Sequence, residues 1–231
     1  MFKKVFPTGR VFLPVIHVVD VPQTLQNIEL AKVGGADGVF LINHNVDHLD
    51  LLKGIFPAAR RSFPDFWLGV NCLGLSTAET LMALPSGTNG LWTDNSTIND
   101  HVPFGTACAG YINTLRKEKH PDILYFGGVA FKGQPPARDP AAAAKKAVPF
   151  MDVVTTSGEA TGIAPSIEKI IAMKNAIGSH PLANASGINL ANVEPYLPYV
   201  DCFLIATGIS RSFTELSLPH VDAMHQMIHR E

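Results

Sequence analysis

The chain has 231 residues, of which 46% are hydrophobic and 16% are charged, and its formal net charge is −2. This length and composition fit one barrel-sized domain over residues 1–231. A nearly neutral chain without a block of basic residues lacks the electrostatic footprint of a nucleic-acid-binding protein. No apolar run reaches the length of a membrane span, and the first residues lack the pattern of a signal peptide.

Cysteine usage and charge bear on the cellular compartment and the oligomeric state of the protein. The three cysteines are an odd number without metal-binding spacing, so we expect reduced thiols and a cytoplasmic protein. They are Cys72, Cys108 and Cys202. The low fraction of charged residues and an apolar face near the C-terminus allow a homo-oligomer.

Short apolar runs recur along the chain, and five of them are led by an aspartate. Because they show little polar–apolar alternation, they predict strands buried on both faces, as in a parallel sheet. We expect strands over residues 14–19, 37–42, 65–70, 90–93, 122–126, 152–155, 181–184 and 201–205. The leading aspartates are expected at the bottom of a barrel, in turn and cap contacts. They are Asp37, Asp65, Asp122, Asp152 and Asp201.

Helical patterns alternate with these runs. We expect helices over residues 24–33, 49–63, 78–84, 106–117, 140–148, 167–177, 190–200 and 219–229. Ser166 is expected to cap the helix that follows it, whereas Pro195 and Pro198 limit the short helix over 190–200. Eight strand–helix repeats predict a (β/α)₈ TIM barrel. A doubly wound sheet is the alternative, but no glycine-rich dinucleotide fingerprint follows the first strand.

Two turns near the end of the chain predict a phosphate site. Ser186 and Gly187 follow the seventh expected strand, and Thr207 and Gly208 follow the eighth. Unblocked backbone N–H groups, short hydroxyls and a following helix N-terminus all favour an anion. The loops after the last two strands are the usual phosphate site of such barrels. The alternative is that both segments are ordinary tight turns.

Polar side chains at the other strand ends predict acid–base chemistry on a phosphorylated small molecule. Asp94 and Glu159 are the candidate acid–base residues, and Lys132 would neutralise developing charge. Each has an alternative role: Asp94 could cap a helix, Glu159 could meet only water, and Lys132 could be a solvated loop residue. The further candidate binding residues are Asn43, Asn71, Ser157, Gly158 and Thr161.

Other titratable residues at the strand ends receive structural interpretations. His17 lies inside the first strand and is expected to be a hydrogen-bonded interior residue. A predicted turn between His44 and His48 argues against a metal pair. Cys72 has no evident partner base and is expected to be an inert thiol. The chain predicts no cofactor and no metal centre, although Asp94 and Glu159 could hold Mg²⁺ beside a phosphate.

The segment 152–162, DVVTTSGEATG, resembles the most distinctive motif of the BtpA/SgcQ family. Segments 35–39, 69–73, 93–94 and 186–193 follow in the family's order, so the resemblance covers about residues 14–210. It implies a phosphate-binding TIM barrel. Family members are associated with photosystem I accumulation or are described by analogy as phosphoribosylanthranilate isomerase-like or nucleotide-acting enzymes. The chain departs from the family at three positions. Asp20 replaces a His, and Gly128 and Gly133 replace the Asp and His that commonly flank the lysine after the fifth strand, here Lys132.

Two functions from different classes fit these features. One is an enzyme with isomerase- or lyase-like chemistry on a phosphosugar or phosphoribosyl compound. The alternative is a non-catalytic binding or assembly factor, BtpA-like in the biogenesis of a protein complex, that keeps the phosphate site. The polar strand ends favour the enzyme, and the departures from the family favour the factor. Whether a bound phosphorylated ligand is chemically changed separates the two.

Overall fold

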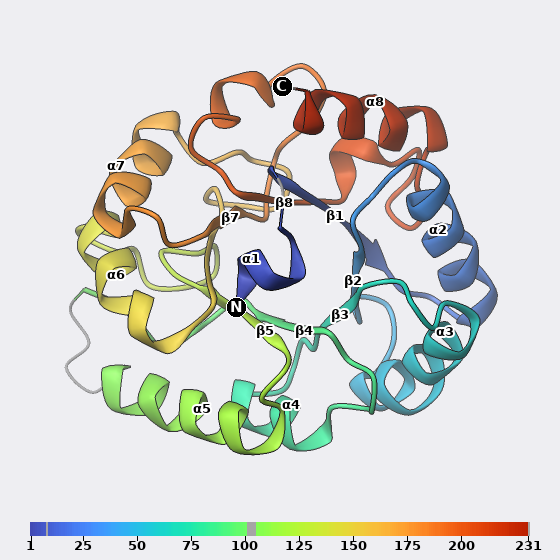
Figure 1. Cartoon of the computed structure of the whole chain (residues 1–231), viewed down its shortest axis with the longest axis horizontal. Helices are drawn as coiled ribbons and strands as arrows, with labels where there is room; N and C mark the ends of the chain where they lie inside the picture. Colours follow the sequence, from blue (N-terminus) through green and yellow to red (C-terminus); the bar gives the residue numbers. More distant parts are fainter. Residues whose placement is uncertain (8, 101–104, 231) are drawn as a thin grey trace.

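The computed structural model describes residues 1–7, 9–100 and 105–230. Eight parallel strands close into a barrel in chain order, with β8 paired to β1. A ring of helices surrounds the ring of strands (Figure 1). The predicted TIM barrel is therefore confirmed, and the doubly wound alternative is wrong. The strands are β1 (Val11–His17), β2 (Val39–Ile42), β3 (Leu68–Asn71), β4 (Gly90–Thr93), β5 (Leu124–Gly128), β6 (Val153–Thr156), β7 (Leu182–Asn184) and β8 (Cys202–Ile205).

Seven of the eight predicted helices follow the predicted ranges within a few residues. Ser166 caps α7 as expected, because its Oγ accepts a hydrogen bond from the Lys169 backbone N–H at 3.2 Å. A π-helical turn, η1, leads directly into α3 within the single helix predicted there. The helical elements are α1 (Phe2–Val5), α2 (Val21–Val33), η1 (Asp50–Ile55), α3 (Phe56–Ser62), α4 (Thr77–Ala83), α5 (Gly105–Lys119), α6 (Pro140–Ala147), η2 (Val148–Phe150), α7 (Ile167–Ile177), η3 (Glu194–Tyr196), η4 (Thr207–Ile209) and α8 (Leu218–His229).

The helix predicted over residues 190–200 is wrong. The segment between β7 and β8 forms the short 3₁₀ turn η3 instead. Pro195 and Pro198 lack the N–H groups that a continuing α-helix requires. Asn192 holds the preceding turn: its Oδ1 accepts from the Asn189 N–H at 2.8 Å, and its Nδ2 donates to the Gly187 carbonyl at 2.9 Å.

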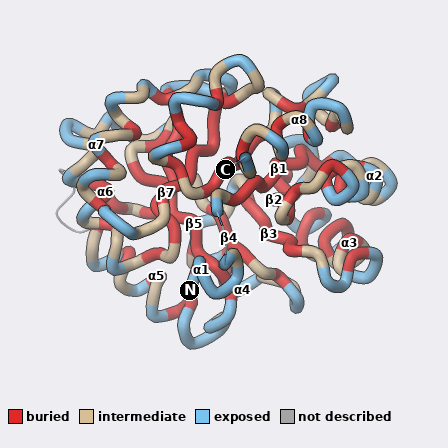
Figure 2. The backbone as a smooth tube through the Cα atoms, turned by 45° about the horizontal axis from the view of Figure 1, so that its top comes forward, coloured by how far each residue is buried: buried red, intermediate tan, exposed pale blue. Residues whose placement is uncertain are grey.

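Aromatic side chains fill the interior of the barrel toward the N-terminal ends of its strands. The Phe40 ring lies 5.2 Å from Trp67, 5.7 Å from Trp92 and 5.1 Å from Phe126, measured between ring centroids. Phe2 of α1 adds a further ring 6.4 Å from Phe126, and α1 lies over the middle of the ring of strands (Figure 1). The strands are buried along nearly their whole length, whereas buried, intermediate and exposed residues alternate along the outer helices (Figure 2). The aromatic rings close the N-terminal end of the barrel, and a central pocket lies at the opposite, C-terminal end.

A side chain before each even-numbered strand ties the barrel together at its N-terminal end. Each side-chain oxygen accepts a hydrogen bond from the backbone N–H at the start of the preceding odd-numbered strand. Three of the five leading aspartates have this role, which confirms the predicted cap contacts for them, whereas Asp65 and Asp122 are exposed. The four pairs are Asp37 with Phe12 at 2.7 Å, Asn89 with Leu68 at 2.9 Å, Asp152 with Tyr125 at 2.9 Å and Asp201 with Leu182 at 2.8 Å.

A basic side chain contacts each of these four side chains, and we call each such group of contacts a clasp. The basic residues lie on α8, α3, α5 and α7, the helices that follow the even-numbered strands β8, β2, β4 and β6. The arrangement therefore repeats four times around the barrel. The contacts are His229–Asp37 at 3.1 Å, Arg60–Asn89 at 2.6 Å, Arg116–Asp152 at 3.0 Å and Lys174–Asp201 at 2.7 Å. The clasps join the outer helices to the strand starts, which stabilises the closed barrel.

The His229 clasp makes part of the stability pH-dependent. Both ring nitrogens face acceptors, Asp37 Oδ2 and the His225 carbonyl, so the protonated ring is favoured. The hydrogen bond with Asp37 raises the pKa of His229, against the opposing effects of burial and of Arg10. The stabilising contribution is therefore full below the unfolded pKa of about 6.5 and is lost as pH rises through the higher folded pKa.

We expect His229→Gln to destabilise the protein more at about pH 5.5 than at about pH 8.5. Urea unfolding of the wild type and the variant at both pH values measures this difference. Because His17 and His180, whose pKa values are lowered by burial, titrate in both proteins, their effects cancel in the comparison. The pKa of His225 is lowered by burial and by the charge of His229, so loss of His229 also relieves this repulsion. An equal loss of unfolding free energy at both pH values would refute the assignment.

Within the described residues, no helix has the length and apolar character needed to cross a membrane. Each of the three cysteines is a free thiol: Cys72 and Cys202 are buried, and Cys108 is exposed. Burial raises the pKa of Cys72 to about 12, so its thiol is protonated at neutral pH, as an inert thiol would be.

Candidate functional site

A central pocket opens at the C-terminal mouth of the barrel and encloses about 70 Å³. Apolar side chains near the C-terminal ends of the strands line it, among them Trp92. The indole N–H of Trp92 is buried and has no hydrogen-bond partner within the described residues. The wall carries titratable and small polar residues from separate loops. These are His17, His44, Asp94, Lys132, Thr161, Ser186, Gly187 and Thr207.

Asp94 is half-buried in the wall, directly after β4. Its Oδ1 accepts a hydrogen bond at 2.9 Å from Nδ2 of Asn71, which is buried at the end of β3. Burial raises the pKa of Asp94, and the Asn71 hydrogen bond and the charges of Lys132 and His44 oppose this shift. A carboxyl group with a raised pKa at a pocket wall is suited to acid–base chemistry.

Lys132 follows β5 and brings a positive charge to the same pocket. Its Nζ lies 3.3 Å from Thr161 Oγ1, and its backbone N–H donates to Ser157 Oγ at 2.8 Å. Burial lowers the pKa of Lys132, and the negative charge of Asp94 opposes this effect. Asp94, Asn71, Lys132 and Thr161 are thus brought together, as a shared site requires.

The two predicted phosphate turns lie on one side of the central pocket, where their small residues allow close packing of three loops. A Cβ on Gly208 would overlap the Ile188 carbonyl oxygen, and a Cβ on Gly187, at φ +70°, would overlap the Ala164 backbone nitrogen. The Ser186 hydroxyl contacts two carbonyl oxygens of the β6–α7 loop, at 2.8 and 2.9 Å. Thr207 begins η4 and lines the pocket.

Three other predicted binding residues hold loops in place. Asn43 pairs with the backbone of Leu73: its Oδ1 accepts at 2.6 Å and its Nδ2 donates at 3.1 Å. Buried Ser157 donates to the Gly158 carbonyl at 2.8 Å, and a Cβ on Gly158 would overlap the Ile163 carbonyl oxygen. These contacts position the loops around the pocket.

Glu159 lies apart from Asp94. It is exposed and lines a second cavity of about 760 Å³ between the β5–α6 and β6–α7 loops, here called the side groove. Lys132 lines both cavities and so connects them. The two carboxylates therefore line different cavities, and within the described residues no group of three His, Cys, Asp or Glu side chains is placed to hold a metal ion.

Lys169 is a side-groove residue that sequence reasoning missed. It projects from α7, and its Nζ donates to the Ala130 carbonyl at 2.6 Å and to the Ser157 carbonyl at 2.8 Å. Burial lowers the pKa of Lys169 to about 8, and the negative charge of Glu159 opposes this shift. In sequence it occupies an ordinary helix position, so the only available signal was its place three residues after the Ser166 cap.

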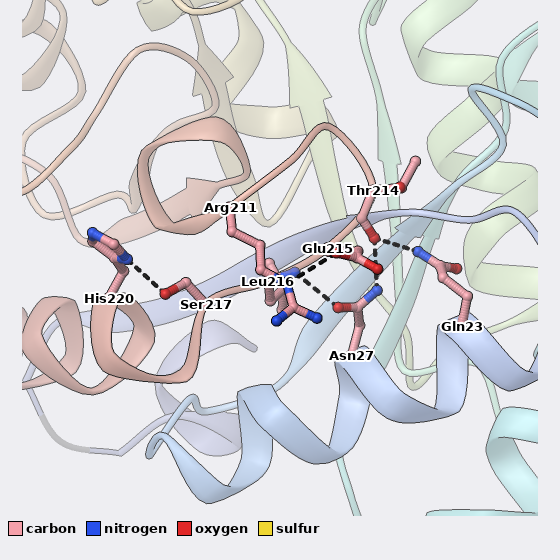
Figure 3. Close-up of polar contacts among 8 residues, drawn as sticks. All are labelled: Gln23, Asn27, Arg211, Thr214, Glu215, Leu216, Ser217 and His220. Atoms are coloured by element: carbon pink, nitrogen blue, oxygen red, sulfur yellow. Dashed lines mark hydrogen bonds and ion pairs between the residues drawn. The ribbon is translucent and has the colours of Figure 1, made fainter.

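The β8–α8 loop is fastened to α2 beside the pocket (Figure 3). The Thr214 carbonyl accepts hydrogen bonds from the side-chain amides of Gln23 and Asn27, the second at 2.8 Å. Asn27 is buried, and its Oδ1 accepts from the Leu216 N–H at 2.9 Å. This fastened loop carries Phe213, whose ring stacks on His17 at 4.0 Å between centroids.

Comparisons with known proteins address the fold. No protein-family model matches the chain, and no curated protein matches it. Solved structures do match it over nearly their whole length. Phosphoribosyl anthranilate isomerase from Thermus thermophilus has a TM-score of 0.63 at 16% identity, over 94% of this chain and 97% of that one.

Two further matches are equally extensive. (S)-3-O-geranylgeranylglyceryl phosphate synthase from Thermoplasma acidophilum, solved with its substrate sn-glycerol-1-phosphate, has a TM-score of 0.66 at 11% identity, over 98% of this chain and 96% of that one. The alpha subunit of tryptophan synthase from Legionella pneumophila has a TM-score of 0.66 at 12% identity, over 98% and 95%. The likeness is one of fold.

Proposed function

We propose that this protein is an enzyme that binds a small phosphorylated metabolite at the C-terminal face of its barrel and performs isomerase- or lyase-like acid–base chemistry. The observation that carries the proposal is the convergence of Asp94, Lys132 and two histidines on one pocket beside the β7 and β8 turns. Burial shifts the pKa values of Asp94, Lys132 and His17, and titratable groups with shifted pKa values gathered in one pocket are typical of catalytic sites.

The phosphate group is assigned to the side of the pocket formed by Ser186, Gly187, Thr207 and Gly208. Support comes from the position of these turns after β7 and β8, the usual phosphate site of TIM barrels. The similar synthase from Thermoplasma acidophilum was solved with a substrate that carries a phosphate. The motif in residues 152–162 adds the proposal that the chain is a member of the BtpA/SgcQ family.

The acid–base work is assigned to Asp94, with Lys132 stabilising negative charge that develops on the substrate. Asn71 and Thr161 position these two groups through the hydrogen bonds described above. Because Lys132 lines both cavities, a ligand with its phosphate in the central pocket extends past Lys132 into the side groove, where it meets Glu159. Both carboxylates then act on one substrate, at different atoms.

Replacing Asp94 by Asn tests this assignment. We expect turnover of the phosphorylated compound that best stabilises the protein to fall by about 10²–10⁴-fold, because Asn cannot transfer a proton. The Asn side chain can still accept the hydrogen bond from Asn71, so the midpoint of thermal unfolding should change little. NMR of the ligand during incubation with each protein measures the rate.

The matched control is Asp122→Asn, which removes a carboxylate from the exposed N-terminal end of the barrel. Its turnover should equal that of the wild type, and Glu159→Gln should lose activity as well if both carboxylates act on the substrate. Normal turnover by Asp94→Asn would exclude Asp94 from the chemistry.

One observation favours the alternative, a binding or assembly factor without turnover. Gly128 and Gly133 stand where the resembled family has an Asp and a His beside the lysine, so two groups that could carry a reaction are replaced. The factor predicts that a phosphorylated ligand binds and is recovered unchanged from every incubation. The enzyme predicts that the ligand is converted.

A further inference from the structure

His17 is the last residue of β1, and its ring forms part of the central pocket. The side chain has only 6% of its residue surface exposed and lies between Phe213, stacked on one face, and His44, edge-on at 5.2 Å. The expectation of a hydrogen-bonded interior residue is confirmed. The ring nevertheless reaches the same pocket as Asp94 and Lys132, which gives it access to a ligand.

The hydrogen bond of His17 fixes which ring nitrogen carries the proton. Nδ1 lies 2.8 Å from the Phe213 carbonyl oxygen. A carbonyl oxygen can only accept, so Nδ1 must be the donor, and Nε2 of the neutral ring then holds an unshared electron pair. Within the described residues Nε2 has no hydrogen-bond partner, so this pair is available to a ligand.

The Phe213 carbonyl is held rigidly enough to impose this tautomer. The next residue, Thr214, is bound through its carbonyl to both Gln23 and Asn27 of α2 (Figure 3). Gln23 also donates to the His17 carbonyl at 3.1 Å, which joins the loop, α2 and the end of β1. A hydrogen bond to one ring nitrogen from a partner that is itself held in place fixes the orientation of functional histidines.

Burial is the main reason that the His17 ring is neutral at neutral pH. Burial lowers its pKa most, the Phe213 hydrogen bond opposes this, and the positive charges of His44 and Lys132 lower it further. Asp94 is the carboxyl group that lines the same pocket. A neutral imidazole with a free Nε2 accepts a proton, whereas Asp94, whose pKa is raised, is suited to donate one.

We propose that His17 is the proton acceptor of the central pocket and that the ligand is a phosphorylated carbonyl compound, an aldose or ketose phosphate. Nε2 takes a proton from the carbon beside the carbonyl group. The electron pair of that C–H bond forms an enolate, whose oxygen is stabilised by Lys132 and protonated by Asp94. The protonated His17 exchanges its proton with solvent and returns one to the carbon, while Asp94 takes back the proton of the enol oxygen, so the carbonyl group and both side chains are restored. This inference rests on the proposed function and names its base and its substrate class.

The tautomer can be tested without a ligand. Long-range ¹⁵N NMR of histidine-labelled protein should show His17 protonated at Nδ1 in the wild type. In Asn27→Ala, which releases one fastening of the loop, the signal should shift toward a mixture of tautomers. A wild-type ring protonated at Nε2 would overturn the proposal whatever ligand the protein binds.

The chemistry is tested by solvent deuterium exchange, with dihydroxyacetone phosphate, ribulose 5-phosphate and fructose 6-phosphate as probes in D₂O. For a probe that stabilises the wild type, we expect deuterium at the carbon beside the carbonyl, with a rate that rises as His17 loses its proton and falls as Asp94 loses its own. His17→Gln should lower this rate at least about 100-fold while ligand stabilisation remains. Lys132→Met should lose affinity as well as rate.

These outcomes separate the two proposals. If probes bind but no deuterium enters, or if His17→Gln exchanges at the wild-type rate, the role of His17 is wrong and phosphate binding stands. If no phosphorylated compound binds, the proposed function itself fails.

Discussion

Replacing Arg116 by Met should lower the free energy of unfolding by about 3–5 kcal/mol, because it leaves the Asp152 carboxylate without its cation. Arg116 is 5% exposed, and its guanidinium lies 3.0 Å from Asp152 Oδ2. It also donates to the Ile123 carbonyl at 3.0 Å and to Asn113 Oδ1 at 3.1 Å. One substitution therefore leaves an unpaired charge and two unsatisfied acceptors. Urea unfolding measures the loss.

The matched control is Lys117→Met, the neighbouring basic residue of α5, which is exposed. Its loss should stay within about 0.5 kcal/mol, as for most surface substitutions. Equal effects of the two substitutions would mean that the clasp between α5 and β5 contributes little to the closed barrel.

Replacing Gly187 by Ala should destabilise the protein by about 2–4 kcal/mol and abolish ligand stabilisation. Two costs add at this position: a left-handed backbone, at φ +70°, and overlap of the new Cβ with the Ala164 backbone. Relief of the overlap requires the β6–α7 and β7 loops to separate. Because both loops line the central pocket, the proposed phosphate contacts should be lost with them. Thermal unfolding with and without ligand measures both effects.

Gly162→Ala measures the first cost, the left-handed backbone, without the second. Gly162 has a similar backbone, at φ +79°, but no heavy atom lies within 4 Å of the position a Cβ would take. Its stability loss should be about 1 kcal/mol, the conformational part alone. If Gly162→Ala and Gly187→Ala destabilise equally, close packing between the loops is not what Gly187 provides.

The barrel was predictable because its signals are local and repeated. Apolar runs such as 37–42 and 201–205 indicate strands buried on both faces, and helical patterns between them leave few topologies. The helix over 190–200 failed for a local reason as well, because Pro195 and Pro198 outweigh the apolar spacing around them. A four-residue helix such as α1 carries too few positions to show a period.

The location of the site could be predicted from the sequence, but which side chains contact one another there could not. Asp94, Lys132 and Ser186 could be placed at the C-terminal mouth from strand order alone. The separation of Glu159 from Asp94 could not, because it depends on the path of the β6–α7 loop. The hydrogen bonds of Gln23 and Asn27 to Thr214 join residues 191 and 187 positions apart in the chain, and no local pattern predicts them.

The central claim is that this barrel binds phosphorylated ligands, and thermal unfolding against a panel of such compounds tests it most directly. The panel contains phosphosugars, phosphoribosyl compounds and nucleotides, with inorganic phosphate and each unphosphorylated parent as controls. At a hundred times its dissociation constant, a bound compound should stabilise the protein by about 2.7 kcal/mol. We predict that at least one phosphorylated compound does so, that its parent does not, and that Lys132→Met reduces the effect. A transition that no compound shifts, inorganic phosphate included, would contradict the account.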